Sequence, residues 1–573
     1  MPLSLPRIRL LLCTFLLTCV SLNSATAAPT PGDQDLIRDR QNRLLEEQSR
    51  RLQELQDLPG KQAKPEAPAT PADSRCFPIK DIELKGADSL SATDRTRLIK
   101  PYIGQCLGVT QLNELLKVIT DYYIDKGRVT SRAYLPQQDL SSGHLQVLVV
   151  EGKLEALKAA EGSTVTDREL AMAFPGKVGE ALNLREIEQL VDQLNRLPSR
   201  QSQMELTPGQ QIGGSDVVVK NVPQKPWRAS LSRNNDGQES TGEQQWNAGL
   251  EWDSPLGLGD QLILRSGHDA VSDHQETSKN NMLYYNVPWG WWNFSYTYSE
   301  SDYRTYGQTD SSKFKLNGDN ENHQLRAERV IHRDDVSKTS VNVGLAHLRT
   351  NNYVLDVRTE PSSNRLSELQ LGLNHGRRIG NAFVNLDLGM QNGIGLLDAQ
   401  SEEERDEFGN RQANSRYRKY TGTVSYLQPF TLWGESFSFT SLATGQRSED
   451  ILFSPQRVSL GGSASVRGLK DQQLTGDSGG YWRNEVRWAR PVTLDWMRPA
   501  FAEYGTSVGY DQGVISNDRY NGDVHGRVSS NSLELFARGK YVSTSVTFAH
   551  SLERPGAVTE REAPIYFRMD FFL

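Results

Sequence analysis

The chain reads Leu460-Gly461-Gly462-Ser463-Ala464-Ser465-Val466-Arg467-Gly468-Leu469, and shortly afterwards Leu474-Thr475-Gly476-Asp477-Ser478-Gly479-Gly480, at the stretch from which its architecture is best inferred. Glycines at this density let the backbone adopt positive φ and pack closely, which an ordinary solvent-exposed loop does not require. Arg467 lies at the tip of the stretch, and no carboxylate stands next to it. The role of this arginine therefore depends on what the rest of the chain builds around it.

The N-terminus has the features of a secretory signal. Arg7 and Arg9 precede an apolar run from Leu10 to Val20, and the small residues Ala25-Thr26-Ala27 follow it. We expect cleavage after the last of these, so that residues 1–27 form the signal peptide. The alternative is an N-terminal membrane anchor, and the shortness of the apolar run argues against it.

Composition limits the classes of function that remain open. The net charge of -7 gives no support for nucleic-acid binding. The mean hydropathy of -0.58 does not exclude a membrane protein, because a transmembrane β-barrel alternates lipid-facing and lumen-facing residues. The sequence has no P-loop or HExxH motif, and its histidines lack metal-ligand spacing. We therefore expect a protein that is not an enzyme and that has no cofactor and no metal.

Two of the four cysteines are expected to remain in the exported protein. Cys13 and Cys19 lie within the signal, whereas Cys76 and Cys106 follow it. An exported chain that keeps one pair of cysteines is expected to oxidise it. The sequence therefore predicts a disulfide between Cys76 and Cys106; two buried free thiols are the alternative.

A charged helix and a linker follow the signal. Between Asp33 and Leu58 the apolar residues form only a narrow stripe among many Arg, Glu and Gln residues. Such a helix is stable only beside a partner or in a polar environment, and a short coiled coil is the alternative. Residues 59–75 are rich in Pro, Ala and Lys and are expected to be extended. The pattern indicates a tethered, detachable helix.

The next two segments have the same predicted order of elements. Residues 76–151 and 152–226 each read as strand, helix, helix, strand, strand. This repetition indicates an internal duplication at the scale of a domain. Two generic α+β modules without a partner are the alternative. The positions that carry the pattern are Leu112, Leu115, Ile119, Leu145, Val147 and Val149 in the first segment, and Leu184, Ile187, Val191 and Leu194 in the second.

From Trp227 onward, two-residue alternation replaces helical spacing. We count about sixteen such segments, and an even number is what closure of an antiparallel barrel requires. A soluble all-β receptor would also alternate. The final strand argues against it, because it runs to the last residue and places five apolar side chains on one face: Ile565, Phe567, Met569, Phe571 and Leu573.

Val466-Arg467-Gly468 resembles the Val-Arg-Gly-aromatic tip of the inward-folding loop of the Omp85 superfamily. With Ser-Leu-Gly-Gly before it and Leu-x-Gly-Asp-x-Gly after it, the stretch is similar to the two-partner secretion transporters of the haemolysin-activator type. The resemblance implies a mainly β fold, with a 16-stranded transmembrane β-barrel, two periplasmic α+β POTRA domains and an N-terminal plug helix. The implied boundaries are 28–58 for the plug helix, 59–75 for the linker, 76–151 and 152–226 for the POTRA domains, and 227–573 for the barrel with an inward loop around 454–480.

The resemblance also implies a partner for the arginine of the loop. In the family, this arginine docks on an acidic residue of a late barrel strand, within a Phe/Gly-x-Asp pattern. The stretch Phe501-Ala502-Glu503 keeps the aromatic residue and the charge, so we expect Arg467 to contact Glu503. Two solvated lumen charges are the alternative. The implied loop residues are Val466, Arg467, Gly468 and Leu469, supported by Gly461, Gly462 and Gly476.

The chain departs from the family pattern at two further positions. Leu469 stands where an aromatic residue is expected after the glycine, which puts a stacking role for that side chain in doubt. Leu573 stands where the family usually ends in Phe, although Phe571 is in the same phase. Phe567, Phe571 and Leu573 are the implied signal for the barrel-assembly machinery.

The implied function is export of an unfolded TpsA-type exoprotein, which could be a haemolysin, an adhesin or a contact-dependent inhibition toxin. The POTRA domains would bind the N-terminal secretion domain of this partner by β-augmentation, without ATP. We expect a monomer in the outer membrane of a Gram-negative bacterium, with its POTRA domains in the periplasm, surrounded by lipid and without nucleic acid. An Omp85-type insertase and a passive porin-like channel are the alternative functions.

Overall fold

The computed structural model describes residues 29–58, 76–270, 275–308, 312–400, 412–516 and 525–573. The predicted signal peptide and the predicted linker lie outside these residues. In the described part of the chain, no helix combines the length and the apolar character needed to cross a membrane.

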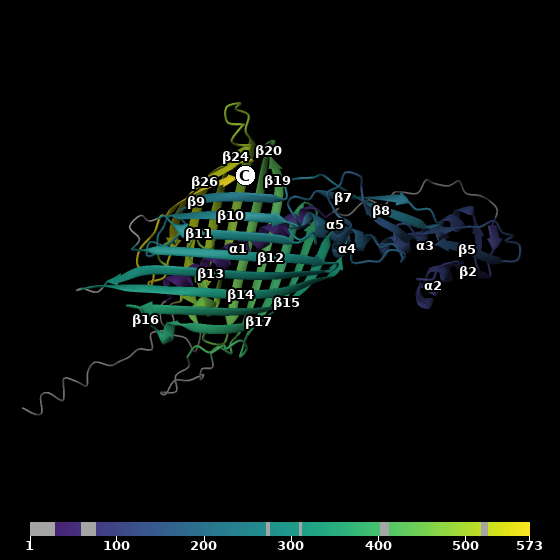
Figure 1. The fold of residues 1–573 in the computed structure, drawn as a ribbon. Coiled ribbons are helices and arrows are strands. Elements are labelled where there is room, and N and C mark those ends of the chain that lie inside the picture. The colour runs from purple at the N-terminus through teal and green to yellow at the C-terminus, as the bar shows by residue number, and fades with distance from the viewer. Residues whose placement is uncertain (1–28, 59–75, 271–274, 309–311, 401–411, 517–524) are drawn as a thin grey trace, which may run out of the picture.

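The C-terminal part of the chain forms a closed β-barrel (Figure 1). Within the described residues the barrel has 16 antiparallel strands, and the short strand β16 (Val357–Arg358) pairs with the end of one of them. The last strand pairs with the first and closes the barrel. In chain order the strands are β9 (Trp227–Asn234), β10 (Gln245–Asp253), β11 (Gln261–Asp269), β12 (Thr277–Trp289), β13 (Trp292–Gln308), β14 (Lys313–Arg333), β15 (Ser337–Val354), β17 (Asn364–Ile379), β18 (Ala382–Ile394), β19 (Arg418–Leu432), β20 (Glu435–Ser448), β23 (Gly479–Pro491), β24 (Glu503–Ile515), β25 (Gly526–Arg538), β26 (Val542–Glu553) and β27 (Ile565–Phe572).

The two-residue alternation of the sequence separates an outer from an inner face of the barrel. In β17, Glu368 and Gln370 line the cavity inside the barrel, whereas Leu371 and Leu373 are exposed on the outside. The barrel and its strand number are therefore as predicted. A polar lumen inside an apolar outer band is the arrangement that a membrane-spanning barrel requires.

Two α+β modules extend in a row from one end of the barrel (Figure 1). In each module, one outer strand lies parallel and the other antiparallel to the central strand. The helices pack on the sheet around separate apolar cores. The first module contains β1 (Cys76–Pro78), β2 (Asp81–Lys85), α2 (Ala92–Ile99), β3 (Cys106–Gly108), α3 (Val109–Asp125), β4 (Arg132–Tyr134) and β5 (His144–Val150); the second contains β6 (Lys153–Ala159), α4 (Asp167–Ala173), α5 (Leu184–Asn195), β7 (Ser202–Pro208) and β8 (Gly214–Asn221).

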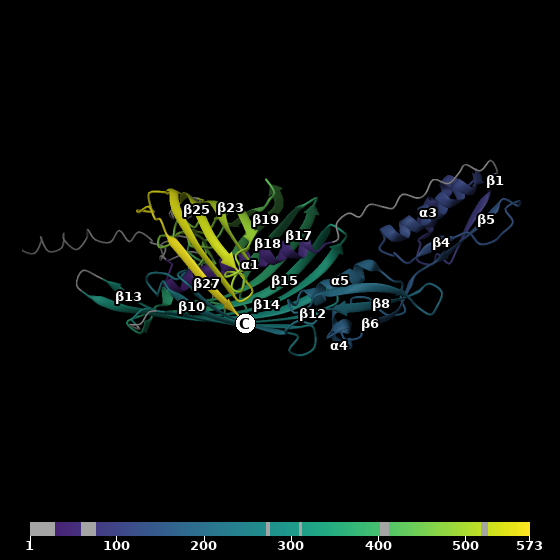
Figure 2. The ribbon, with the colours of Figure 1, turned by 90° about the horizontal axis from the view of Figure 1, so that it is seen from above.

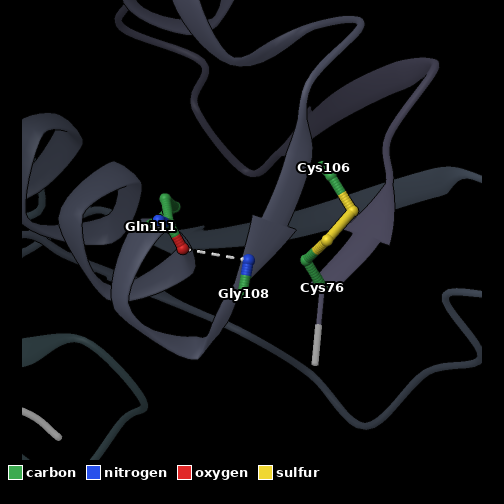
Figure 3. Close-up of a disulfide and its surroundings, with 4 residues drawn as sticks. All are labelled: Cys76, Cys106, Gly108 and Gln111. Atoms are coloured by element: carbon green, nitrogen blue, oxygen red, sulfur yellow. Dashed lines mark hydrogen bonds between the residues drawn. A yellow bond between two sulfur atoms is a disulfide. The ribbon is translucent and has the colours of Figure 1, made fainter. Parts of the chain in front are cut away.

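The predicted disulfide between Cys76 and Cys106 is present (Figure 3). It joins β1 to β3, which pair as a small two-stranded sheet of the first module, separate from its three-stranded sheet. Immediately after β3, the side chain of Gln111 accepts a hydrogen bond from the backbone N–H of Gly108 at 3.0 Å. This contact caps the start of α3, so the disulfide holds the N-terminal end of the module against its long helix.

The second module is bound directly to turns of the barrel, at the end that we call the module end; the opposite end is the far end. The side chain of Gln193 in α5 donates hydrogen bonds to the carbonyls of Gly290 and Trp292, at 3.0 and 3.1 Å. The buried Glu169 accepts a hydrogen bond from Ser254 in a barrel turn. Although burial raises the pKa of Glu169, hydrogen bonds from Ser254 and Thr166 and the charge of Arg200 bring this pKa below its usual value. The carboxylate is therefore charged, and it fastens the module to the barrel.

The helix α1 (Pro31–Gln56) lies inside the barrel (Figures 1 and 2). Thr30 caps its N-terminus: the Thr30 hydroxyl accepts from the N–H of Asp33, and the Asp33 carboxylate accepts from the N–H of Thr30. The N-terminus of α1 contacts Tyr303 and Asn320 near the far end, and Leu58 contacts Arg378 at the module end. A helix with so narrow an apolar stripe requires a polar environment, and the barrel lumen provides it.

Candidate functional site

The glycine-rich stretch forms a loop that enters the lumen from the far end. After β20 the chain passes through the short helix η3 (Ser454–Gln456) into strand β21 (Val458–Leu460), which pairs with β22 (Leu474–Gly476). Gly461 and Gly462 have φ angles of 142° and 88°, a region in which side chains are strained, so the glycines allow the sharp reversal after β21. The turn returns at Leu469, whose carbonyl accepts a hydrogen bond from Gly462. The loop is thus a hairpin with a compact tip.

The tip of this loop is anchored by an apolar cluster inside the barrel. Val466 and Leu469 are both fully buried, together with Leu460 and with residues of the barrel wall such as Ile515 and Val528. Leu469 therefore takes the place of an aromatic residue by packing in this cluster. Such a cluster within a polar lumen keeps water away from the neighbouring arginine, which strengthens its ionic contacts.

Arg467 lies at the tip and is bound to two carboxylates of the barrel wall. Its Nε and Nη2 donate to the two carboxylate oxygens of Asp511 in β24 at 2.8 and 2.7 Å, and its backbone N–H donates to Asp511 at 3.1 Å. Nη1 donates to Glu485 in β23 at 3.0 Å. Arg467 is 5% exposed and Asp511 is 0% exposed, so this is a buried ion pair with bidentate geometry. Tyr566 of the last strand donates to the carbonyl of Arg467 at 3.0 Å.

The predicted contact between Arg467 and Glu503 is wrong. Glu503 begins β24 at the module end, where it pairs with Arg487 at 2.7 Å. Asp511 stands eight residues further along the strand, which is roughly 26 Å at the rise of a β-strand. Because the loop enters from the far end, its tip reaches Asp511 and not Glu503. The signal that could have identified Asp511 is Gly509-Tyr510-Asp511, which matches the Gly-x-Asp form of the family pattern.

Glycines of the wall make room for the loop tip. A Cβ at Gly509 would overlap Nη2 of Arg467, and a Cβ at Gly513 would lie 2.9 Å from the methyl groups of Leu460. Gly468 lies equally close to the wall, because a Cβ there would lie 2.5 Å from Ser530. The glycines of the loop and of β24 therefore allow two backbones to approach closely.

The Gly509→Ala substitution is expected to displace the guanidinium of Arg467 from Asp511. The added methyl group occupies the space of Nη2, while alanine is tolerated in the strand itself. We expect faster protease cleavage of the loop in the purified protein, with the barrel still folded by its electrophoretic mobility. Gly422→Ala in β19 is the matched control, because the nearest atom to its new methyl group would be a leucine carbon 3.8 Å away. Equal cleavage rates for the two variants would contradict the role of Gly509.

The helix α1 fills much of the remaining lumen through polar contacts. Arg51 donates from Nη2 to both oxygens of Glu328 in β14 at 2.7 Å. Gln48 accepts from Asn385 and Ser425 at 3.0 and 2.8 Å. A cavity of about 680 Å³ lined by α1 and the wall remains beside the helix.

The helix also contacts the loop and the second module. Gln41 donates to the carbonyl of Ser459 in β21 at 2.7 Å. At the module end, Lys338 of β15 lies 3.5 Å from Glu54 of α1 and 3.3 Å from Asp192 of α5. One lysine thus bridges the helix in the lumen and the module outside it. These contacts could not be inferred from the sequence, because their partners lie far apart along the chain.

The structure also places the remaining residues that the sequence singled out, namely Gly476 and the C-terminal residues of the expected assembly signal. A Cβ at Gly476 would overlap the side chain of Ile515, which explains the glycine there. Phe571 of the last strand and Leu573 just after it are exposed, at 40% and 74%. The backbone of Leu573 donates to Ala229 of the first strand at 2.9 Å and so contributes to closure of the barrel. Recognition of Phe567, Phe571 and Leu573 during assembly remains a prediction.

A closed barrel with two α+β modules at one end and an inward loop bound to the wall is the architecture of an outer-membrane transporter with POTRA domains. Residues 213–536 match the family of haemolysin secretion/activation protein ShlB/FhaC/HecB, residues 77–152 match a POTRA domain of the ShlB type, and residues 153–208 match a further POTRA domain. The chain belongs to the ShlB/FhaC/HecB family, and it is an outer-membrane transporter of the two-partner secretion class.

Similar proteins support this assignment over nearly the whole chain. The outer membrane transporter CdiB of Escherichia coli O6:K15:H31 is 32% identical, with 96% of this chain and 92% of that protein covered. The hemolysin transporter protein HpmB of Proteus mirabilis is 28% identical, with 82% of this chain and 84% of that protein covered. The solved structure of CdiB from Escherichia coli matches with a TM-score of 0.89 at 32% identity, and it covers 96% of this chain and 100% of that chain.

Proposed function

We propose that the chain exports one partner exoprotein of the TpsA type through the barrel lumen, after α1 has left it and the loop has shifted. The observation that carries this proposal is the way in which α1 occupies the lumen. The buried side chains of the helix include Asp33, Asp35, Gln41, Gln48 and Arg51, and most of their contacts to the wall are hydrogen bonds or ion pairs.

Polar contacts of this kind can be exchanged for contacts with water at small net cost. A helix held by a continuous apolar interface would instead lose its burial energy on leaving. The largest apolar contact of α1 is at its C-terminal end, where Leu52 and Leu55, with Leu58 just beyond the helix, pack on Phe383; Leu45 also packs on the apolar cluster of the loop. The helix is therefore built to leave the lumen, and its C-terminal end is the part that holds it most firmly.

The exoprotein is captured at the edges of the module sheets. In the first module, within the residues that the structure describes, β4 pairs with only one strand, β5; at its other edge the N–H of Ala133 donates to the hydroxyl of Thr120 at 3.1 Å, and no strand is paired there. Tyr134 and Leu135 at this edge are 51% and 39% exposed. An extended segment of the secretion domain would add a strand here through main-chain hydrogen bonds, while its side chains contact these apolar groups.

Capture is coupled to opening through Lys338. Displacement of α5 by a bound exoprotein would remove Asp192 from Lys338, and the lysine would lose one of the two carboxylates that hold it beside Glu54. Because Arg333 also contacts Glu188 and Asp192 of α5, the whole turn between β14 and β15 would respond. The process involves no catalysis and no ATP; folding of the exoprotein at the cell surface supplies the driving force.

Removal of the chain from its native host tests this proposal. We expect one large exoprotein to disappear from the cell surface and the medium, while the other outer-membrane barrels keep their normal abundance in a quantitative surface proteome. Restoring the chain on a plasmid should restore that exoprotein. Depletion of many barrels would instead identify an insertase, and an unchanged set of secreted proteins would identify a passive channel.

A further inference from the structure

Four arginines form a row on the outer surface of the barrel near its far end. In β15 and β17, even-numbered residues such as Ala346 and Glu368 line the lumen, so Arg349 and Arg365 face outward. The same alternation places Arg418 of β19 and Arg447 of β20 on the outer face, because Thr421, Thr423, Thr444 and Gln446 line the lumen. All four side chains are exposed.

The row borders the apolar band of the barrel. On β17, Arg365 follows the outward-facing Leu371 and Leu373 toward the far end, and on β19 Arg418 follows Val424 and Tyr420. Each arginine lies in the part of its strand that is farthest from the modules: Arg365 is the second residue of β17, Arg418 is the first of β19, and Arg447 is the last but one of β20. The arginines thus stand where the acyl chains of the outer leaflet end and its headgroups begin.

The residues that the structure describes do not neutralise the positive charges of the row. None of the four arginines forms an ion pair with any part of the chain that the structure describes. Arg349 and Arg365 are directly opposite each other in neighbouring strands, an arrangement of like charges that is unfavourable unless an anion lies between them. The flank formed by β13 and β14 is acidic, since Glu300 pairs with Glu321 and Asp302 with Asp319, so the row is confined to one side of the barrel.

We propose that the row Arg349, Arg365, Arg418 and Arg447 binds the phosphate groups of a phosphorylated glycolipid of the outer leaflet, of the lipid A class. The planar guanidinium binds phosphate oxygens in bidentate fashion, and two neighbouring arginines can share one phosphate. The acyl chains of the same molecule cover the apolar band below the row. Charge and apolar surface together fit an amphiphile with an anionic head, and this contact fixes the height and orientation of the barrel in the membrane.

The test uses the full mature protein in detergent, with lipid binding measured by native mass spectrometry. The probes are bisphosphorylated lipid A and lipid A from which both phosphates have been removed, and inorganic phosphate serves as a competitor. The test variant combines Arg349→Gln, Arg365→Gln, Arg418→Gln and Arg447→Gln. The matched control combines Arg329→Gln and Arg377→Gln, which are also exposed on the outer face but lie at the module end.

We expect bisphosphorylated lipid A to bind the wild type and the control equally, and the test variant about tenfold or more weakly, because charge-assisted contacts are lost. Dephosphorylated lipid A should bind the wild type as weakly as the phosphorylated lipid binds the variant. Equal binding of both lipids to the wild type would overturn the proposal, and this comparison does not depend on the variant's folding. Displacement of the lipid by millimolar phosphate would show a site for free phosphate and would also overturn it.

Discussion

Deletion of residues 31–58 is expected to convert a nearly closed barrel into an open pore. The deletion removes a column about 10 Å wide from the lumen, so single-channel conductance in a planar bilayer should rise roughly tenfold. The loop with Arg467 stays in place, because its lock on Asp511 and Glu485 does not involve α1. With the helix in place, the described residues leave a cavity of about 680 Å³ beside it, so we expect a low conductance for the intact protein.

Two arginines of the same helix provide a matched pair for this prediction. Arg51 is buried and bound to Glu328, whereas the side chain of Arg50 is 47% exposed and lies 3.8 Å from Glu54. Arg51→Gln should therefore increase the frequency of open events, and Arg50→Gln should leave it near the wild-type value. If the deletion left the conductance unchanged, α1 would not be the element that closes the pore.

Replacement of Arg467 by alanine is expected to release the loop from the wall and to lower secretion severely. The substitution leaves Asp511 fully buried, and among the described residues its remaining partners are the Ser530 hydroxyl at 3.4 Å and Arg483 at 4.0 Å. Breaking a buried ion pair from one side costs about 3–5 kcal/mol. We expect rapid protease cleavage of the loop and loss of most of the secreted exoprotein, measured in cells that contain normal amounts of folded barrel.

Substitutions of the two acidic residues of β24 distinguish loss of the contact between Arg467 and Asp511 from a general effect of removing a charge in the lumen. Asp511→Asn should reproduce the loss seen with Arg467→Ala, because the bidentate contact disappears. Glu503→Gln should secrete nearly as well as the wild type, since Glu503 is bound to Arg487 and its side chain is 39% exposed. Equal loss in both variants would contradict the assignment of Asp511 as the partner of the arginine.

The two-residue alternation of the strands and the order of strands and helices in the modules could be predicted from the sequence, because both depend on neighbouring residues alone. Alternation along Ile565 to Leu573 requires only that successive residues of a strand face opposite sides, and the structure has all of these residues except Leu573 in β27. The repeated order of strand, helix, helix, strand, strand was visible for the same reason. The disulfide could also be predicted, because the sequence indicates export and leaves one pair of cysteines after the signal peptide.

The partners of the site depend on distances that the sequence does not contain. Glu503 and Asp511 lie on the same strand and face the same side, and the depth to which the loop enters the lumen decides between them. The polar and charged residues of α1 gave no indication of Glu328, Asp387 or Ser459 as partners, because each lies hundreds of residues away. The polar surface of α1 showed only that it required a polar environment, which proved to be the lumen.

A reversible tether between α1 and the wall measures most directly whether the lumen must be vacated. The Cγ of Leu55 lies 3.2 Å from the position of a Cβ at Gly376 in β17, and in a disulfide a sulfur lies about 3 Å from the far Cβ. The combination Leu55→Cys and Gly376→Cys should therefore form a disulfide that holds α1 in the barrel. The two single variants and the wild type with reductant are the controls, because the reductant also reaches Cys76 and Cys106. We predict that the tethered protein secretes no exoprotein and that reduction restores secretion; normal secretion with the tether intact would show that the exoprotein passes by another route.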